Sequence, residues 1–100
     1  MIRITVKRKE HIESIEVKGH ANSADHGHDL VCAIVSGITT GLANALYEMV
    51  GEDDMSLTEG HALISIKDPT EKSDTILETA IIMLKTAQEV NKDYIKIMEV

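Results

Sequence analysis

The chain has 100 residues, the size of one domain with one modest core, and we expect residues 1–100 to form a single domain. Its 10 basic and 17 acidic residues give a formal net charge of −7. This charge argues against direct nucleic-acid binding, because phosphate recognition depends on clustered cations. Without Trp or Phe, the core has to be aliphatic. A single cysteine excludes an intramolecular disulfide and fits a reducing compartment.

The first 18 residues predict a β-hairpin. Apolar and polar residues alternate over residues 2–7 and again over 15–18, which is the period of a half-buried strand. The polar stretch 8–11 between them predicts the turn. This N-terminus lacks the hydrophobic core of a signal peptide, and we find no apolar run of the length that spans a bilayer. We therefore expect a cytoplasmic protein without a membrane partner.

A polar loop and a long helix follow. Residues 19–29 contain three of the five histidines and no large apolar residue, so we expect this loop to be mobile. Residues 30–50 predict a helix, with Asp29 as its N-cap and Gly51 at its end. Because apolar or small residues surround most of this helix, we expect it to be central and buried.

Small residues recur every four positions along the same helix. They form a smooth ridge that predicts close packing against another element, either within the subunit or between subunits, because each glycine lowers helix propensity. The ridge consists of Ala33, Gly37, Gly41 and Ala45.

The C-terminal half predicts a strand, a second helix and a last strand. Alternation over residues 62–66 indicates the strand. Asp68 followed by Pro69 is typical of a helix start with Asp68 as the cap, although the start can slip to Ser73. One face of this helix carries Ile76, Ala80, Met83, Leu84 and Ala87.

This second helix is expected to end near Asn91, and residues 94–100 predict the last strand. The order β-β-α-β-α-β predicts the α+β class, as a two-layer α/β sandwich. Both helices should cover one face of a four-stranded mixed sheet.

Cys32 is the third residue after the predicted cap, in the first turn of the helix. Backbone amides there carry partial positive charge, which stabilises a thiolate, the nucleophilic form of cysteine. Free amides at the same helix end can also hold the oxyanion of a tetrahedral intermediate. The alternative is a small buried residue in an apolar stretch, since free cysteine is among the most buried residue types.

Three histidines lie within reach of Cys32. His20 follows a predicted strand and therefore has a rigid support, so we favour it as the general base. His26 and His28 lie deep in the loop, and we interpret both as solvated. The other two, His11 and His61, lie in or near predicted turns and are interpreted as surface residues.

Two further residues are candidates for supporting the site. Asp29 is foremost the helix cap, but a carboxylate can also orient an imidazole. The same negative charge would oppose a neighbouring thiolate. Ser36 lies four residues after Cys32, on the same helix face, where it can bind substrate or simply allow close packing.

Two other classes of function remain open from the residues alone. A zinc site has enough donors, but the spacing is not that of a zinc finger and one cysteine is few for a structural site. A non-catalytic binding module with a structural cysteine would keep full function after Cys32→Ser. We place the zinc site well below catalysis, the binding module stays open at this point, and we expect no metal and no cofactor. The donors for zinc would be His20, Asp25, His26, His28, Asp29 and Cys32.

The segment Gly-His-Ala at 19–21, the run Gly-His-Asp-Leu-Val-Cys-Ala at 27–33 and the serine at 36 closely resemble the ribosomal-processing cysteine protease family called Prp. The resemblance implies a catalytic dyad of His20 and Cys32, with Asp29 and Ser36 supporting the site or the substrate. It also implies a homodimer whose loop between the two motifs reshapes on binding.

The substrate implied by this resemblance is the twenty-seventh protein of the bacterial large ribosomal subunit. The family removes a short N-terminal extension from that protein by cutting after an aromatic pair. The acidic charge of this chain suits such a basic ribosomal precursor.

Overall fold

Five strands and two helices follow one another in the computed structural model, which describes residues 1–21 and 29–100. They are β1 (Ile2–Arg8), β2 (Ile12–Lys18), α1 (Leu30–Val50), β3 (Met55–Thr58), β4 (His61–Ser65), α2 (Glu71–Glu89) and β5 (Ile95–Glu99). The expected loop 19–29 falls largely on residues 22–28, so its predicted mobility lies outside the described residues.

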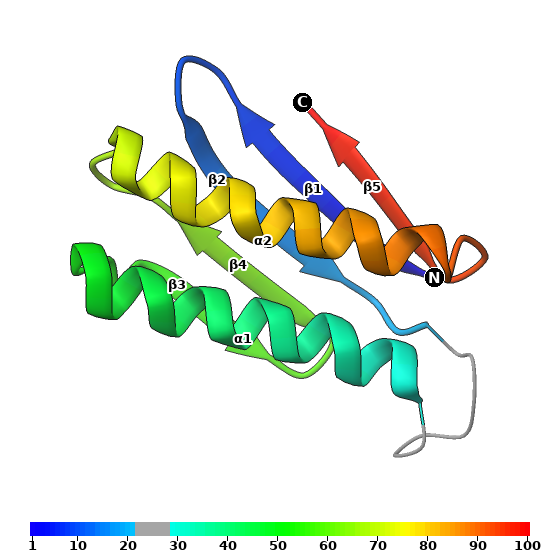
Figure 1. The fold of residues 1–100 in the computed structure, drawn as a ribbon. Helices are drawn as coiled ribbons and strands as arrows, with labels where there is room; N and C mark the ends of the chain where they lie inside the picture. Colours follow the sequence, from blue (N-terminus) through cyan, green and yellow to red (C-terminus); the bar gives the residue numbers. More distant parts are fainter. Residues whose placement is uncertain (22–28) are drawn as a thin grey trace.

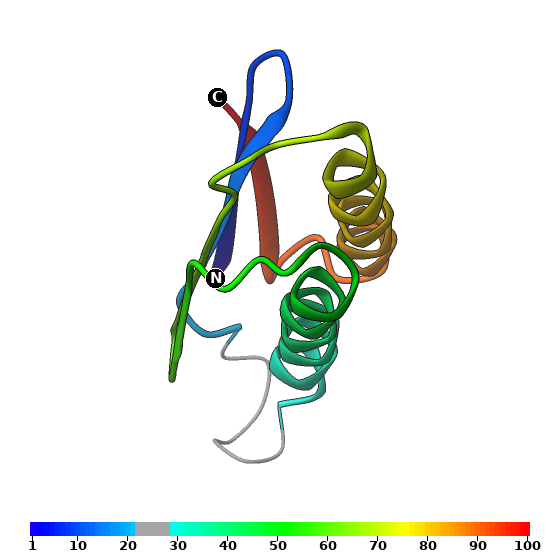
Figure 2. The ribbon, with the colours of Figure 1, turned by 90° about the vertical axis from the view of Figure 1, so that its left-hand side faces the viewer.

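The strands form one mixed sheet in the order β3-β4-β2-β1-β5. β1 pairs in parallel with β5, and the other neighbours pair antiparallel. Both helices lie side by side on the same face of this sheet (Figure 1), and the edge-on view in Figure 2 shows the two layers. The predicted two-layer sandwich is therefore confirmed.

The predicted number of four strands is wrong, because the chain between α1 and β4 contains the additional strand β3. This edge strand has only four residues and no fully buried side chain, so its apolar–polar alternation is too short to predict a strand by itself. It turns into β4 at Gly60, whose φ of +74° is the backbone conformation that favours glycine.

The core is aliphatic, as the composition predicts, and fills the space between the sheet and the helices. The buried face of α2 contains Ala80, Leu84 and Ala87, as predicted. It also contains Leu77 and Ile81, which are fully buried, whereas Met83 is 52% exposed. Which side of the helix is buried depends on its packing against the sheet and α1, and the sequence of one helix does not reveal this packing. Large side chains with less than 2% exposure include Ile2, Ile4, Val6, Ile15, Ile64, Ile95, Leu46, Leu77, Ile81 and Leu84.

α1 begins and ends as predicted, with Asp29 as the N-cap and Gly51 in the left-handed conformation after the last turn. The prediction that it is central and buried is wrong, because one side packs on the sheet and the other carries exposed residues such as Ile34 and Met49. The small-residue ridge lies on this outer side, since a Cβ on Gly37 or Gly41 would meet nothing within 4 Å.

The expectation that no apolar run reaches the length of a membrane span also needs correction. By length and composition alone, α1 is apolar and long enough to cross a bilayer. In this fold α1 forms the helical layer of the sandwich together with α2. The residues that it buries are Val31, Val35, Thr39, Leu42, Ala43 and Leu46.

α2 begins two residues later than the predicted cap at Asp68 implies. The cap is Thr70, whose hydroxyl accepts from the Ser73 amide at 3.1 Å, while the Ser73 hydroxyl accepts from the Thr70 amide at 2.9 Å. This reciprocal capping box satisfies two backbone amides at the start of the helix.

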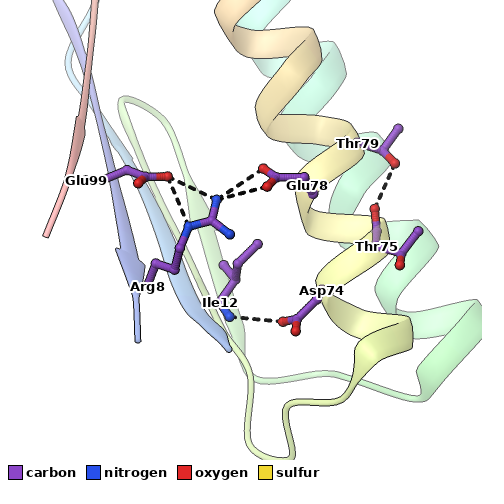
Figure 3. Close-up of polar contacts among 7 residues, drawn as sticks. All are labelled: Arg8, Ile12, Asp74, Thr75, Glu78, Thr79 and Glu99. Carbon is purple, nitrogen blue, oxygen red and sulfur yellow. Dashed lines mark hydrogen bonds and ion pairs between the residues drawn. The ribbon is translucent and has the colours of Figure 1, made fainter. Parts of the chain in front are cut away.

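Polar contacts fasten α2 to the sheet near the β1–β2 turn (Figure 3). Arg8 binds Glu99 of β5 at 3.0 Å and Glu78 of α2 at 3.1 Å. Asp74 accepts from the Ile12 amide at 3.0 Å and contacts His11 Nδ1 at 2.6 Å, so His11 is more than the surface residue that we predicted. The His11 hydrogen bond lowers the pKa of Asp74 and raises the pKa of His11.

Candidate active site

Three segments distant in sequence meet at the end of the sheet where β2 ends and α1 begins. β2 leads into Gly19, which has a φ of +93°, and then His20. The N-terminal turns of α1 carry Cys32, and the β3–β4 turn carries Gly60. Together these segments line a pocket of about 120 Å³ that includes His20, Cys32, Ser36 and Gly60. The structure thus brings together three of the four predicted site residues.

Cys32 is half-buried in the first turn of α1, as its position after the cap predicts. Its Sγ accepts a hydrogen bond from the backbone amide of Ala21 at 3.3 Å. This donor and the partial positive charge of the helix N-terminus both suit a sulfur that has to carry negative charge during a reaction. The thiol also opens onto the pocket, so it is not the fully buried structural cysteine of the alternative interpretation.

His20 lies directly beyond the end of β2, and both its backbone and its imidazole ring contact neighbouring segments. Its carbonyl oxygen accepts from the Met1 amino group at 2.7 Å. The amide of the preceding Gly19 donates to the Gly60 carbonyl at 2.9 Å. The imidazole lies against the β3–β4 turn, because Nε2 is only 2.9 Å from where a Cβ of Gly60 would stand.

Asp29 caps α1, since its Oδ1 accepts from the Cys32 amide at 3.1 Å and its carbonyl accepts from the Ala33 amide at 3.1 Å. This confirms the predicted cap. It also means that the Cys32 amide is not one of the free amides that we expect to hold an oxyanion. Ser36 is exposed and lines the pocket one helical turn after Cys32. Substrate binding by Ser36 stays a prediction.

The sequence reasoning missed two contributions from the β3–β4 hairpin. Thr58 and Gly60 line the pocket, but Thr58 ends β3 and Gly60 lies in the turn after it, and β3 was not predicted. His61 also lines it, and its Nε2 lies 2.8 Å from Glu16 Oε2, a contact that lowers the pKa of Glu16. The pair Glu59–Gly60, followed by the alternation over 61–65, was the available signal for a hairpin turn.

The zinc interpretation receives no support from the part of the chain that the structure describes. Among residues 1–21 and 29–100, no three His, Cys, Asp or Glu side chains come together as a metal site. Three of the proposed zinc donors, Asp25, His26 and His28, lie outside the described residues. The interpretation of His26 and His28 as solvated loop residues therefore also concerns residues that the structure does not describe.

Comparison with known proteins identifies the class of site. The sequence model of the family described as cysteine protease Prp matches residues 1–96. This chain belongs to the Prp family. It is therefore a cysteine protease, and the binding-module interpretation gives way to an enzyme.

Relatives in the Prp family match nearly the whole chain. The ribosomal processing cysteine protease Prp of Bacillus subtilis is 33% identical over 97% of this chain and 96% of its own length. The protein of the same name from Staphylococcus aureus is 29% identical over 96% of this chain and 94% of its own.

Solved Prp structures share the fold. The S. aureus protease in complex with a covalently linked product peptide superposes with a TM-score of 0.91 at 26% identity, over 100% of both chains. The same protease in complex with a substrate peptide gives 0.86 at 25% identity, again over 100% of both chains.

Proposed function

We propose that this Prp protease removes the N-terminal extension of a large-subunit ribosomal protein, with Cys32 as the nucleophile and His20 as the general acid and base. The observation that carries the residue assignment is that Cys32 is the single cysteine of a chain in a cysteine protease family. It shares a pocket with His20, whose ring is held against the β3–β4 turn. The ribosomal substrate is supported by the names of the relatives from B. subtilis and S. aureus.

The proposed reaction needs one proton shuttle. The His20 imidazole takes the proton from Cys32, and the thiolate adds to the scissile carbonyl carbon. The tetrahedral intermediate collapses, the C–N bond breaks, and the imidazolium gives its proton to the leaving amine. Water then attacks the thioester with the imidazole as base, which releases the carboxylic acid and restores the thiol. Ser36 lies where its hydroxyl can bind the peptide during both steps.

The charge of the chain supports a basic substrate. A net charge of −7 attracts a basic ribosomal precursor by electrostatic steering, and added salt should slow the association. We propose that the reaction takes place in the cytoplasm, where a free thiol such as that of Cys32 stays reduced.

We also propose that the enzyme acts as a homodimer that packs through the outer side of its helices. An apolar groove of about 580 Å³ runs between α1 and α2, and glycines on α1 would let a second helix layer approach closely. Met49 and Met83 are exposed at this groove and can adapt to such a partner. Gly41→Glu places a charge there and should convert dimer to monomer in sedimentation equilibrium. A wild-type monomer at micromolar concentration would contradict the proposal.

The deciding experiment is mass spectrometry of the extended ribosomal precursor after incubation with four enzymes. Wild type and His11→Ala should both make a single cut near the aromatic pair of the extension, because His11 lies outside the pocket. Cys32→Ala and His20→Ala should leave the precursor intact. Cleavage by His20→Ala at the wild-type rate would refute its role, and a precursor that wild type leaves uncut would refute the proposed substrate.

A further inference from the structure

Gly60 closes the two-residue turn between β3 and β4, next to the active-site pocket. Its φ of +74° explains a glycine in a hairpin turn without any reference to function. A second observation concerns the space between Gly60 and the His20 ring. A Cβ on Gly60 would stand 2.9 Å from Nε2, 3.5 Å from Cε1 and 3.7 Å from Cδ2 of His20. The imidazole therefore occupies the space that a side chain at position 60 would take.

Gly51 provides an internal comparison. Its φ of +70° is nearly the same as that of Gly60, yet a Cβ on Gly51 would meet nothing within 4 Å. At position 51, the left-handed backbone is by itself a sufficient reason for glycine. At position 60, the contact with His20 is a second reason. The Gly60 carbonyl also accepts from the amide of Gly19 at 2.9 Å, so the turn holds the backbone just before His20.

We propose that Gly60 is a positioning residue for His20, and this inference rests on the proposed role of His20 as general acid and base. Because position 60 has no side chain, the ring can lie against the turn and face the pocket that it shares with Cys32. A methyl group there would displace a side chain rather than the backbone. A displaced His20 ring should therefore lower the reaction rate more than the stability of the fold, since proton transfer tolerates little misplacement.

The test compares Gly60→Ala with Gly51→Ala, which carries a similar backbone strain without a neighbour. Both variants should lose similar thermal stability. With a fluorogenic peptide from the ribosomal extension, Gly60→Ala should lower kcat roughly 10²-fold and change KM by less than about 3-fold. Gly51→Ala should stay within about 2-fold of wild type in both constants, as expected for a site remote from the chemistry.

Two further measurements keep the result interpretable. Gly60→Asn tolerates the left-handed backbone but still adds a Cβ, so it should lose kcat like Gly60→Ala even if the alanine variant folds poorly. The rate of Cys32 alkylation by iodoacetamide against pH, which needs no substrate, should shift in Gly60→Asn toward the profile of His20→Ala. A role in folding alone would not move this profile.

The outcomes separate the inference from the function on which it rests. If His20→Ala is inactive while Gly60→Ala and Gly60→Asn keep the kcat of Gly51→Ala, the positioning role is overturned and the proposed function stands. If His20→Ala cleaves as wild type does, the catalytic role of His20 is overturned, and the positioning role with it.

Discussion

The N-cap of α1 allows the two interpretations of Asp29 to be separated with a pair of substitutions. Its Oδ1 accepts from the Cys32 amide at 3.1 Å, directly beside the proposed nucleophile. Asp29→Asn keeps an acceptor of the same shape but removes the charge, while Asp29→Ala removes both. Because asparagine caps helices as well as aspartate does, only the alanine variant should lose the cap.

The expected losses of stability follow from the two roles of the Asp29 carboxylate, as a hydrogen-bond acceptor and as a negative charge. Loss of the cap hydrogen bond costs about 1 kcal/mol of unfolding free energy. Loss of a negative charge at the helix N-terminus costs a further ~0.3–1 kcal/mol, and both variants share this part. Asp29→Ala should therefore be less stable than Asp29→Asn by about 1 kcal/mol, which corresponds to roughly 4–8 °C in Tm for a domain of this size.

The assay combines thermal unfolding with the rate of Cys32 alkylation near neutral pH. If Asp29 acts as a cap, Asp29→Asn should keep peptide cleavage, and its thiol should react at least as fast as in wild type, because a like charge beside the thiolate is gone. Equal Tm values for the two variants would refute the cap energetics. A folded Asp29→Asn without cleavage would show that the carboxylate itself is needed, as an orienting group for the imidazole.

Three predictions concern the scaffold. Leu46→Ala, at a fully buried position, should cost about 2–5 kcal/mol in urea unfolding. Ile82→Ala, at an exposed position of α2 that does not line the proposed dimer groove, should cost under about 0.5 kcal/mol, and similar costs for the two variants would contradict the packing. Glu52 is 8% exposed and accepts from two backbone amides, at 3.2 and 3.0 Å, so Glu52→Ala should cost about 1–3 kcal/mol, and an unchanged urea midpoint would count against these bonds. The His11–Asp74 pair raises the pKa of His11 and lowers that of Asp74. Its stabilisation is therefore complete between the ordinary values of about 3.9 and 6.5. It is lost as pH rises through the raised pKa of His11 or falls through the lowered pKa of Asp74. The difference in urea midpoint between wild type and His11→Ala should be larger at pH 5.5 than at pH 9, and a difference independent of pH would contradict this coupling.

Local patterns predicted the elements whose signals are contained in short segments. Alternation identified β1, β2 and β4, and the Asp29 and Gly51 caps identified both ends of α1. β3 was not predicted because its alternation covers only four residues, which is too short a signal, and as an edge strand it buries no side chain completely. The cap of α2 was placed at Asp68 instead of Thr70 because both fit a start signature, and only the reciprocal bonds with Ser73 distinguish them.

The sequence by itself determined the class of chemistry through the family motif around His20 and Cys32, because the residue types alone left a zinc site and a binding module open. It also determined the aliphatic core, through the composition, and the two-layer fold, through the order of the strands and helices. Tertiary structure alone decided what surrounds the histidine. Gly60 lies forty residues after His20, and their contact depends on how β3, β4 and β2 align in the sheet, which is a property of long-range pairing rather than of any local pattern.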